Sequence, residues 1–269
     1  MSDPPIKIAV NGAAGRMGRQ VTLLTLQDEQ LELAAALEFD NHPDFGSDAG
    51  TVCGHGPCGV SIQSVLEHRV DVVIDFSTPE GVESIVGTCE DRLIPLVLAT
   101  TGLSKNQHSI VDTAAQSIPV VLAPNMSLAV NLVMKLVADA ASVLSQNTAG
   151  VDVEIIERHH RFKEDAPSGT ALHFGNIVAE NMGQTRHIHG REGRPGLRSQ
   201  NEIGYHALRT GDNVGEHTIV FGMMGETIDL TVRGHTRDSY AYGALQAARF
   251  LIGRGAGMYS MADVLGFDA

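Results

Sequence analysis

The segment from Glu157 to Thr170 holds the residues whose types and spacing best suit chemistry. It places adjacent imidazoles at His159 and His160 and an ammonium group at Lys163 in the run ERHHRFKEDAPSGT. Histidine titrates near neutral pH, so it is the side chain best suited to transfer a proton. The chain has only 19 Lys and Arg residues against 32 Asp and Glu. A local group of cations in such an acidic chain indicates a binding site for a small anionic substrate.

The same segment could be structural, since a lone histidine is usually a satisfied structural residue. An alternating run at 151–156 predicts a strand, so the segment begins where a strand gives way to a loop. Adjacent histidines on a strand end point to opposite faces, so at most one faces a reaction centre unless the backbone turns. Residues 168–170 are typical of a helix N-terminus, whose N–H groups could hold a carboxylate. We expect the nearby acids to be solvated or to order the loop: Glu154, Glu157, Glu164 and Asp165.

A glycine-rich turn near the N-terminus is the second chemical signature. Gly12, Gly15 and Gly18 follow an apolar run at 6–10 and open a helical pattern. Glycines there allow a tight turn and the close approach of a pyrophosphate to helix N–H groups. The spacing is G-x-x-G-x-x-G, so an ordinary strand–helix turn is the alternative. Glu38, at the end of the second predicted strand, favours dinucleotide binding because an acid there can bind ribose hydroxyls.

Three further polar turns each follow a predicted strand, at 75–79 (DFSTP), 99–102 (ATTG) and 123–127 (APNMS). Taken singly, each of these segments could instead be an ordinary turn or helix N-cap, where Ser, Thr and Asn are favoured. The carboxyl ends of parallel strands meet at one edge of a sheet, where ligands bind. Three such turns on the edge that carries the glycine turn therefore favour a cofactor cleft.

The apolar patterns predict two domains. Strands at 6–10, 31–37, 70–76, 93–99 and 119–123 alternate with helices, which indicates an α/β, Rossmann-like parallel sheet. A helix is expected over 126–146. Alternation at 151–156, 202–208, 217–221 and 226–232 predicts an α+β domain with an antiparallel or mixed sheet, and 183–200 predicts a loop or flap. A helix at 240–252 is apolar enough to return to the first domain. We therefore expect a dinucleotide-binding domain of 1–127 and 241–269, and a second domain of 128–240.

Composition excludes several classes of protein. The net charge of −13 argues against a nucleic-acid binder, and the absence of Trp argues against base-stacking platforms. No apolar run reaches the roughly 18 residues of a membrane helix, and the N-terminus lacks a signal-peptide pattern, so we expect no membrane partner. Three cysteines suit a reduced cytoplasmic protein. Cys53 and Cys58, or His187 and His189, could suggest zinc, but no second ligand pair is evident, so we predict no metal site.

These motifs, in this order, closely resemble the dihydrodipicolinate reductase (4-hydroxy-tetrahydrodipicolinate reductase) family over essentially the whole chain. The resemblance is carried by VNGAAGRMG, DFSTP, ATTG, PNMS, the run from His159 to Leu172, and GEHT at 215–218. It implies an enzyme of the diaminopimelate route to lysine that reduces a cyclic dicarboxylate with NADH or NADPH. It also implies a homotetramer built through the sheets of the second domain, which would then serve substrate binding and oligomerisation. With the cofactor in one domain and the substrate in the other, we expect closure on ternary-complex formation.

The resemblance also implies roles for individual residues. His159 is the implied proton donor and Lys163 assists it. Substrate carboxylates are held by His160, Ser168, Gly169 and Thr170. The cofactor site is lined by Gly12, Ala13, Ala14, Gly15, Arg16, Met17, Glu38, Ala99, Thr100, Thr101, Ala123, Pro124, Asn125 and Met126.

The chain departs from the family pattern at three positions. Phe39 stands where an Arg often follows the acid that binds the ribose. No positive charge next to Glu38 therefore balances the negative charge of a 2′-phosphate. We expect NADH to serve at least as well as NADPH. Ala99 replaces a Gly and Phe162 replaces a His. We expect these two changes to alter details of the site but not the class of reaction. Two other interpretations stay open: a different two-domain reductase, such as an amino-acid or aldehyde dehydrogenase, and a non-catalytic nucleotide sensor.

Overall fold

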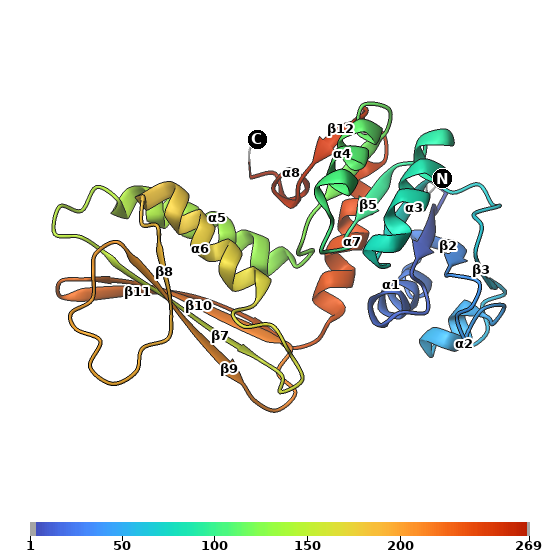
Figure 1. Cartoon of the computed structure of the whole chain (residues 1–269). Coiled ribbons are helices and arrows are strands. Elements are labelled where there is room, and N and C mark those ends of the chain that lie inside the picture. The colour runs from blue at the N-terminus through green and yellow to red at the C-terminus, as the bar shows by residue number, and fades with distance from the viewer. Residues whose placement is uncertain (1–3, 268–269) are drawn as a thin grey trace. The chain divides into compact units, whose positions relative to one another are not determined.

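The computed structural model describes residues 4–267, which form two compact units (Figure 1). The described residues up to Leu128 and those from Arg237 onward make the first unit, and Ala129–Thr236 makes the second. The chain returns to the first unit just before helix α7 (Asp238–Leu251), a few residues earlier than the expected start at 241. A boundary at 241 would divide one continuous helix.

The first unit is built on a seven-stranded sheet with the order β12-β6-β5-β4-β1-β2-β3. Its strands are β1 (Ile6–Asn11), β2 (Leu31–Leu37), β3 (Ile62–Gln63), β4 (Val72–Asp75), β5 (Leu96–Leu98), β6 (Pro119–Leu122) and β12 (Gly257–Tyr259). Every neighbouring pair is parallel, as the alternation of strands and helices predicted. Strand order reverses between β1 and β4, and in such sheets ligands bind at that reversal.

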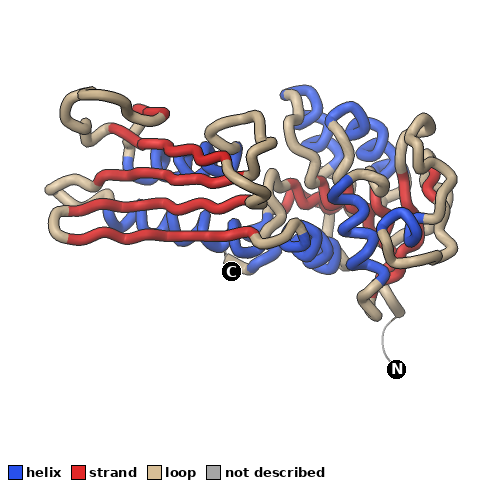
Figure 2. The backbone as a smooth tube through the Cα atoms, turned by 90° about the horizontal axis from the view of Figure 1, so that it is seen from below, coloured by secondary structure: helices blue, strands red, loops and turns tan. Residues whose placement is uncertain are grey.

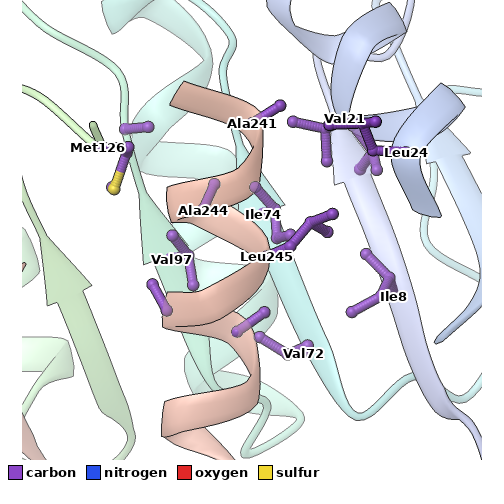
Figure 3. Close-up of a cluster of buried hydrophobic side chains, with 14 of the residues drawn as sticks. Ile8, Val21, Leu24, Val72, Ile74, Val97, Met126, Ala241, Ala244 and Leu245 are labelled. Carbon is purple, nitrogen blue, oxygen red and sulfur yellow. The ribbon is translucent and has the colours of Figure 1, made fainter. Parts of the chain in front are cut away.

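Two layers of helix cover this sheet. The helices of the first unit are α1 (Arg16–Leu26), α2 (Ala49–Cys53), α3 (Pro79–Asp91), α4 (Lys105–Ala114), α7 and α8 (Met261–Leu265). Side chains alternate along a strand. Ile8 accordingly joins the core beneath α1 and α7, whereas Ala9 joins the core beneath α3 and α4. Figure 3 shows Ala241 and Ala244 of α7 against the first of these cores, where small side chains allow the helix to lie close to the strands.

The second unit pairs one sheet with two helices. Its strands are β7 (Asp152–His159), β8 (Arg186–His189), β9 (Glu202–Arg209), β10 (Gly215–Met223) and β11 (Glu226–Gly234), in the order β11-β10-β7-β9-β8. β10 runs antiparallel to β7 and β11, while β9 runs parallel to β7 and β8, so the sheet is mixed. Helices α5 (Leu128–Leu144) and α6 (Gly169–Met182) pack on one face, and in the described chain no helix covers the other (Figure 2).

Some elements were not anticipated from the sequence. The stretch 183–200, expected to be a loop or flap, contains the edge strand β8. Strand β8 contacts its neighbour β9 through imidazole rings. His187 and His189 both stack on Tyr205 of β9, with ring centroids 5.6 and 5.3 Å apart. Strands β3 and β12, of two and three residues, are too short to produce a recognisable periodicity.

Candidate active site

The glycine turn after β1 has the geometry of a phosphate-binding turn. Gly12 has φ +75°, and a Cβ there would lie 2.8 Å from the carbonyl oxygen of Phe76. A Cβ on Gly18 would lie 1.9 Å from the carbonyl oxygen of Gly12, so helix α1 packs directly on the turn. Helix α1 begins immediately after Gly15, and its first N–H groups have no intrahelical acceptors. These features fit a pyrophosphate, which needs backbone donors at close range.

Glu38 lies beside this turn, directly after β2. Its Oε2 accepts a hydrogen bond from the backbone N–H of Ala14 at 3.2 Å, and its Oε1 accepts one from Phe39 at 3.2 Å. The Phe39 side chain is 60% exposed and meets the ring of His42 edge-on at 5.3 Å. The acid that the sequence placed near a ribose is thus next to the glycine turn, with an aromatic surface rather than a cation beside it. Arg16, in the first turn of α1, is exposed.

A buried carboxylate ties the ends of three strands together. Asp75, at the end of β4, accepts hydrogen bonds from Asn11 Nδ2 at 2.6 Å and from Thr100 Oγ1 at 2.5 Å. Its burial raises its pKa, although these hydrogen bonds oppose that shift. Sequence reasoning assigned Thr100 to the cofactor site but did not find this bond. The structure therefore commits the Thr100 hydroxyl to holding the end of β5 against β4.

The remaining predicted cofactor residues follow β5 and β6 on the same edge. Ala99 and Ala123 are buried, whereas Thr101 and Pro124 are exposed. Met126 belongs to the core, and its carbonyl would lie 1.7 Å from a Cβ on Gly243 of α7 (Figure 3). The Oδ1 of Asn125 accepts the N–H of Ser127 at 2.9 Å, which shapes the turn. Together with Ala13 and Ala14, which are buried in the glycine turn, these positions form one continuous strand edge.

The second unit carries the histidine chemistry at the end of β7. His159 is the last residue of β7 and is only 8% exposed, with its Nδ1 2.6 Å from Oε2 of Glu157. The ring of His217, on β10, meets it edge-on with centroids 5.2 Å apart. Burial, assisted by the proximity of His159, lowers the pKa of His217 to about 4, so His217 is neutral at pH 7.

Glu157 differs from its expected role as a solvated acid, because its side chain is only 1% exposed. Burial alone would raise its pKa, but hydrogen bonds from His159 and Arg209 lower it to about 2. Glu157 does order the loop, which was its other expected role, because its Oε1 accepts a hydrogen bond from the backbone N–H of Ser168 at 3.1 Å. The sequence contains a signal for this burial, because Glu157 lies on the same face of the strand as Val153 and Ile155.

Ser168 begins helix α6 as its N-cap. Its Oγ accepts the N–H of Ala171 at 3.2 Å and lies 3.0 Å from Nε2 of His217, and the residue is 2% exposed. The hydroxyl is thus committed to the helix cap and to His217. Gly169 and Thr170 form the first turn of α6, where helix N–H groups and the positive end of the dipole favour a carboxylate.

Lys163 lies in the turn between β7 and α6. Its backbone N–H donates to the carbonyl of His160 at 3.1 Å, and its Nζ lies 2.7 Å from Oδ1 of Asp165. The ring of Phe162, which is 77% exposed, lies 6.2 Å from that of His160. The structure therefore places the predicted proton donor at the end of β7, the predicted ammonium group in the turn that follows, and a helix N-terminus where that turn ends.

Alternative chemistries find little support. Within residues 4–267 no group of three or more His, Cys, Asp or Glu side chains could hold a metal ion. Cys89 is buried, and burial raises the pKa of its thiol to about 12, which makes it a poor nucleophile. A dehydrogenase that acts through a catalytic cysteine would need a far more acidic thiol. None of the helices in the described part of the chain is long and apolar enough to cross a membrane.

A parallel-sheet dinucleotide domain joined to a sheet-and-helix domain that carries a His–Lys loop defines a two-domain, NAD(P)H-dependent oxidoreductase. The family models for the N-terminus and the C-terminus of dihydrodipicolinate reductase match residues 6–126 and 129–265. The chain therefore belongs to the dihydrodipicolinate reductase family.

Individual relatives agree with this assignment. The 4-hydroxy-tetrahydrodipicolinate reductase of Rhodopirellula baltica is 53% identical over 275 residues, which cover 99% of this chain and 98% of the relative. The enzyme of the same name from Syntrophotalea carbinolica is 45% identical and covers 97% and 99%. A dipicolinate-bound dihydrodipicolinate reductase from Paenisporosarcina sp. TG-14 shares the fold, with a TM-score of 0.77 at 24% identity over 96% of this chain and 98% of that one.

Proposed function

We propose that this protein reduces 4-hydroxy-tetrahydrodipicolinate, by way of dihydrodipicolinate, to tetrahydrodipicolinate with NADH or NADPH, as a step of diaminopimelate and lysine biosynthesis. The observation that carries the proposal is the loop that joins the His159–Glu157 pair, Lys163 and the N-terminus of α6. A proton donor, a cation and an anion-binding helix end are what reduction of a cyclic dicarboxylate requires. The two relatives that bear this activity in their names cover 99% and 97% of the chain.

Each group of residues then has a chemical task. The bound nicotinamide supplies a hydride. Gly12 to Met17, Glu38 and the turns at 99–101 and 123–126 hold the dinucleotide. His160 and the N-terminus of α6 hold the substrate carboxylates. His159 donates a proton from Nε2 to the carbon or nitrogen that gains negative charge, while Lys163 balances the charge of the dianion.

Turnover with the correct substrate tests the proposal directly. We expect the purified protein to oxidise NADH when pyruvate and aspartate semialdehyde have been condensed beforehand, and not with either compound alone. The reason is that one carboxylate would engage only part of the loop around Gly169 and Thr170. Absorbance of NADH at a fixed protein concentration measures the rate. Turnover of simple 2-keto acids without turnover of the condensed substrate would contradict the proposal.

The environment of Glu38 predicts the cofactor preference. A carboxylate accepts hydrogen bonds from ribose hydroxyls but repels a 2′-phosphate, and Phe39 provides no compensating charge. We expect kcat/KM with NADH to equal or exceed that with NADPH at fixed ionic strength. Phe39→Arg should move the ratio toward NADPH by roughly 10-fold, the size of one charge-assisted contact. A strong NADPH advantage in the unaltered protein would contradict this assignment.

We also propose that the protein is a cytoplasmic homotetramer assembled through the second-unit sheet. The face of that sheet opposite α5 and α6 bears no helix in the described chain, and it exposes Ile156 and Leu208, each 38% accessible. Apolar strand faces of this kind are normally covered. We expect sedimentation equilibrium to give four times the mass of 28.6 kDa. A monomer at micromolar concentration would exclude the tetramer.

A further inference from the structure

Glu157 and Arg209 form an ion pair directly behind the histidine of the candidate site. In the parallel register of β7 and β9, Arg209 lies opposite His159, two residues beyond the partner of Glu157. Nη1 and Nη2 of Arg209 each donate to a different oxygen of the Glu157 carboxylate at 2.8 Å. Such a bidentate, charge-assisted pair fixes the carboxylate in orientation as well as in charge. The oxygen bound by Nη1 is the one that lies 2.6 Å from His159 Nδ1.

This contact decides which nitrogen of His159 is available. An ionised carboxylate only accepts hydrogen bonds, so Nδ1 of His159 must carry the proton that points at Glu157. Nε2 is then the nitrogen left to exchange a proton with substrate. Without the carboxylate the neutral ring would be free to adopt either tautomer, and its orientation would lose its anchor.

Arg209 also reaches the loop that carries Lys163. Its Nη2 donates to the backbone carbonyl of Asp165 at 2.6 Å, and the side chain of Asp165 in turn holds Lys163 Nζ at 2.7 Å. One guanidinium therefore connects the carboxylate behind His159 with the residue that holds Lys163. Sequence analysis gave Arg209 no role, since it lies 50 residues beyond His159 along the chain.

We propose that Glu157 and Arg209 are positioning residues of the reaction: Glu157 selects the reactive nitrogen of His159, and Arg209 locks Glu157 and aligns the Lys163 loop with it. This inference rests on the proposed function. The charged or titratable groups around His159 come from its own strand, from β9, from β10 and from the following loop, and they are Glu157, Arg209, His217, Lys163 and Asp165.

The same strand offers a matched control. Glu154 lies on the opposite face of β7 and is clamped in the same bidentate manner by Arg191, at 2.9 and 2.8 Å. Hydrogen bonds lower the pKa of Glu154 to about 2, against the effect of burial, as they do for Glu157. Glu154 therefore reproduces the ion pair and its strand but has no contact with His159 among the interactions of the described residues. Glu154 differs in binding Arg198 and His206 as well, at 3.0 and 2.8 Å, so it controls for the loss of a clamped carboxylate on β7 and not for burial.

The experiment compares Glu157→Gln with Glu154→Gln, and Arg209→Lys with Arg191→Lys. For each variant, kcat, KM, the pH profile of kcat/KM, NADH binding and the thermal midpoint are measured. We expect Glu157→Gln to lower kcat at least ~10-fold with KM changed less than ~3-fold, as when a carboxylate that orients a histidine is lost. Because the carboxylate that faces Nδ1 of His159 is gone, the pH profile of kcat/KM should change in this variant. Neither control variant should shift the pH profile.

Two further measurements keep the inference testable. If Glu157→Gln fails to fold because Arg209 is left without its partner, the double variant Glu157→Gln/Arg209→Met removes both charges and should show the same loss of kcat and the same change in the pH profile. Imidazole ¹⁵N shifts at alkaline pH should show His159 protonated on Nδ1 in the unaltered protein and a tautomer mixture in Glu157→Gln. Unchanged kcat, pH profile and tautomer in Glu157→Gln would overturn the inference. Absence of turnover in the unaltered protein would instead refute the proposed function, and the tautomer measurement would still judge Glu157.

Discussion

Replacement of His159 by Gln is expected to lower kcat by roughly 10²–10⁴, the usual contribution of a general acid. KM should change much less, because the substrate carboxylates are assigned to His160 and the start of α6. Glutamine retains a polar side chain of similar reach but cannot deliver a proton near neutral pH. The affinity for NADH should stay close to that of the unaltered protein, since His159 belongs to the other compact unit. Steady-state kinetics beside an NADH titration measure both quantities.

His173→Gln is the matched control for this substitution. His173 lies on α6 in the same unit and is exposed, so its loss should leave kcat and KM unchanged. A thermal midpoint for each variant separates lost chemistry from lost folding. Near-normal turnover in His159→Gln would place the proton donor elsewhere and reduce this loop to a binding element.

Removal of the ammonium group at Lys163 should act on both kinetic constants. In Lys163→Ala we expect kcat to fall and KM to rise together, with kcat/KM lowered roughly 10–100-fold. The physical reason is that a substrate carboxylate loses a charge-assisted partner while the reaction loses charge balance. Nζ lies 2.7 Å from Oδ1 of Asp165, an exposed carboxylate that a substrate carboxylate can replace.

Lys135→Ala provides the corresponding control. Lys135 forms a comparable pair with Asp139 within helix α5, at 2.5 Å. Surface pairs of this kind contribute little to stability, so the variant should keep normal kinetics. If Lys163→Ala changed KM alone, Lys163 would be a binding residue without a part in the chemical step.

The order of elements could be predicted, and the candidate residues could be proposed, because their signals are local. β2 was predicted with its observed bounds, and the helix start at Ser168 was evident from turn chemistry alone. The glycine turn needed only a spacing and an acid after the second strand. Short pieces such as β3, and the polar edge strand β8, lack enough periodic residues to be recognised.

The surroundings of His159 depended on the tertiary structure. Parity along β7 put Glu157 and His159 on the same face, but only the packing of α5 and α6 made that face the buried one. Arg209 and His217 reach the site through the register of β9 and β10, and a shift of one residue would turn either side chain to the opposite face. Register is set by the packing of whole strands against a shared core. The sequence by itself therefore determined which residues could do the chemistry, and the tertiary structure alone decided which partners hold them.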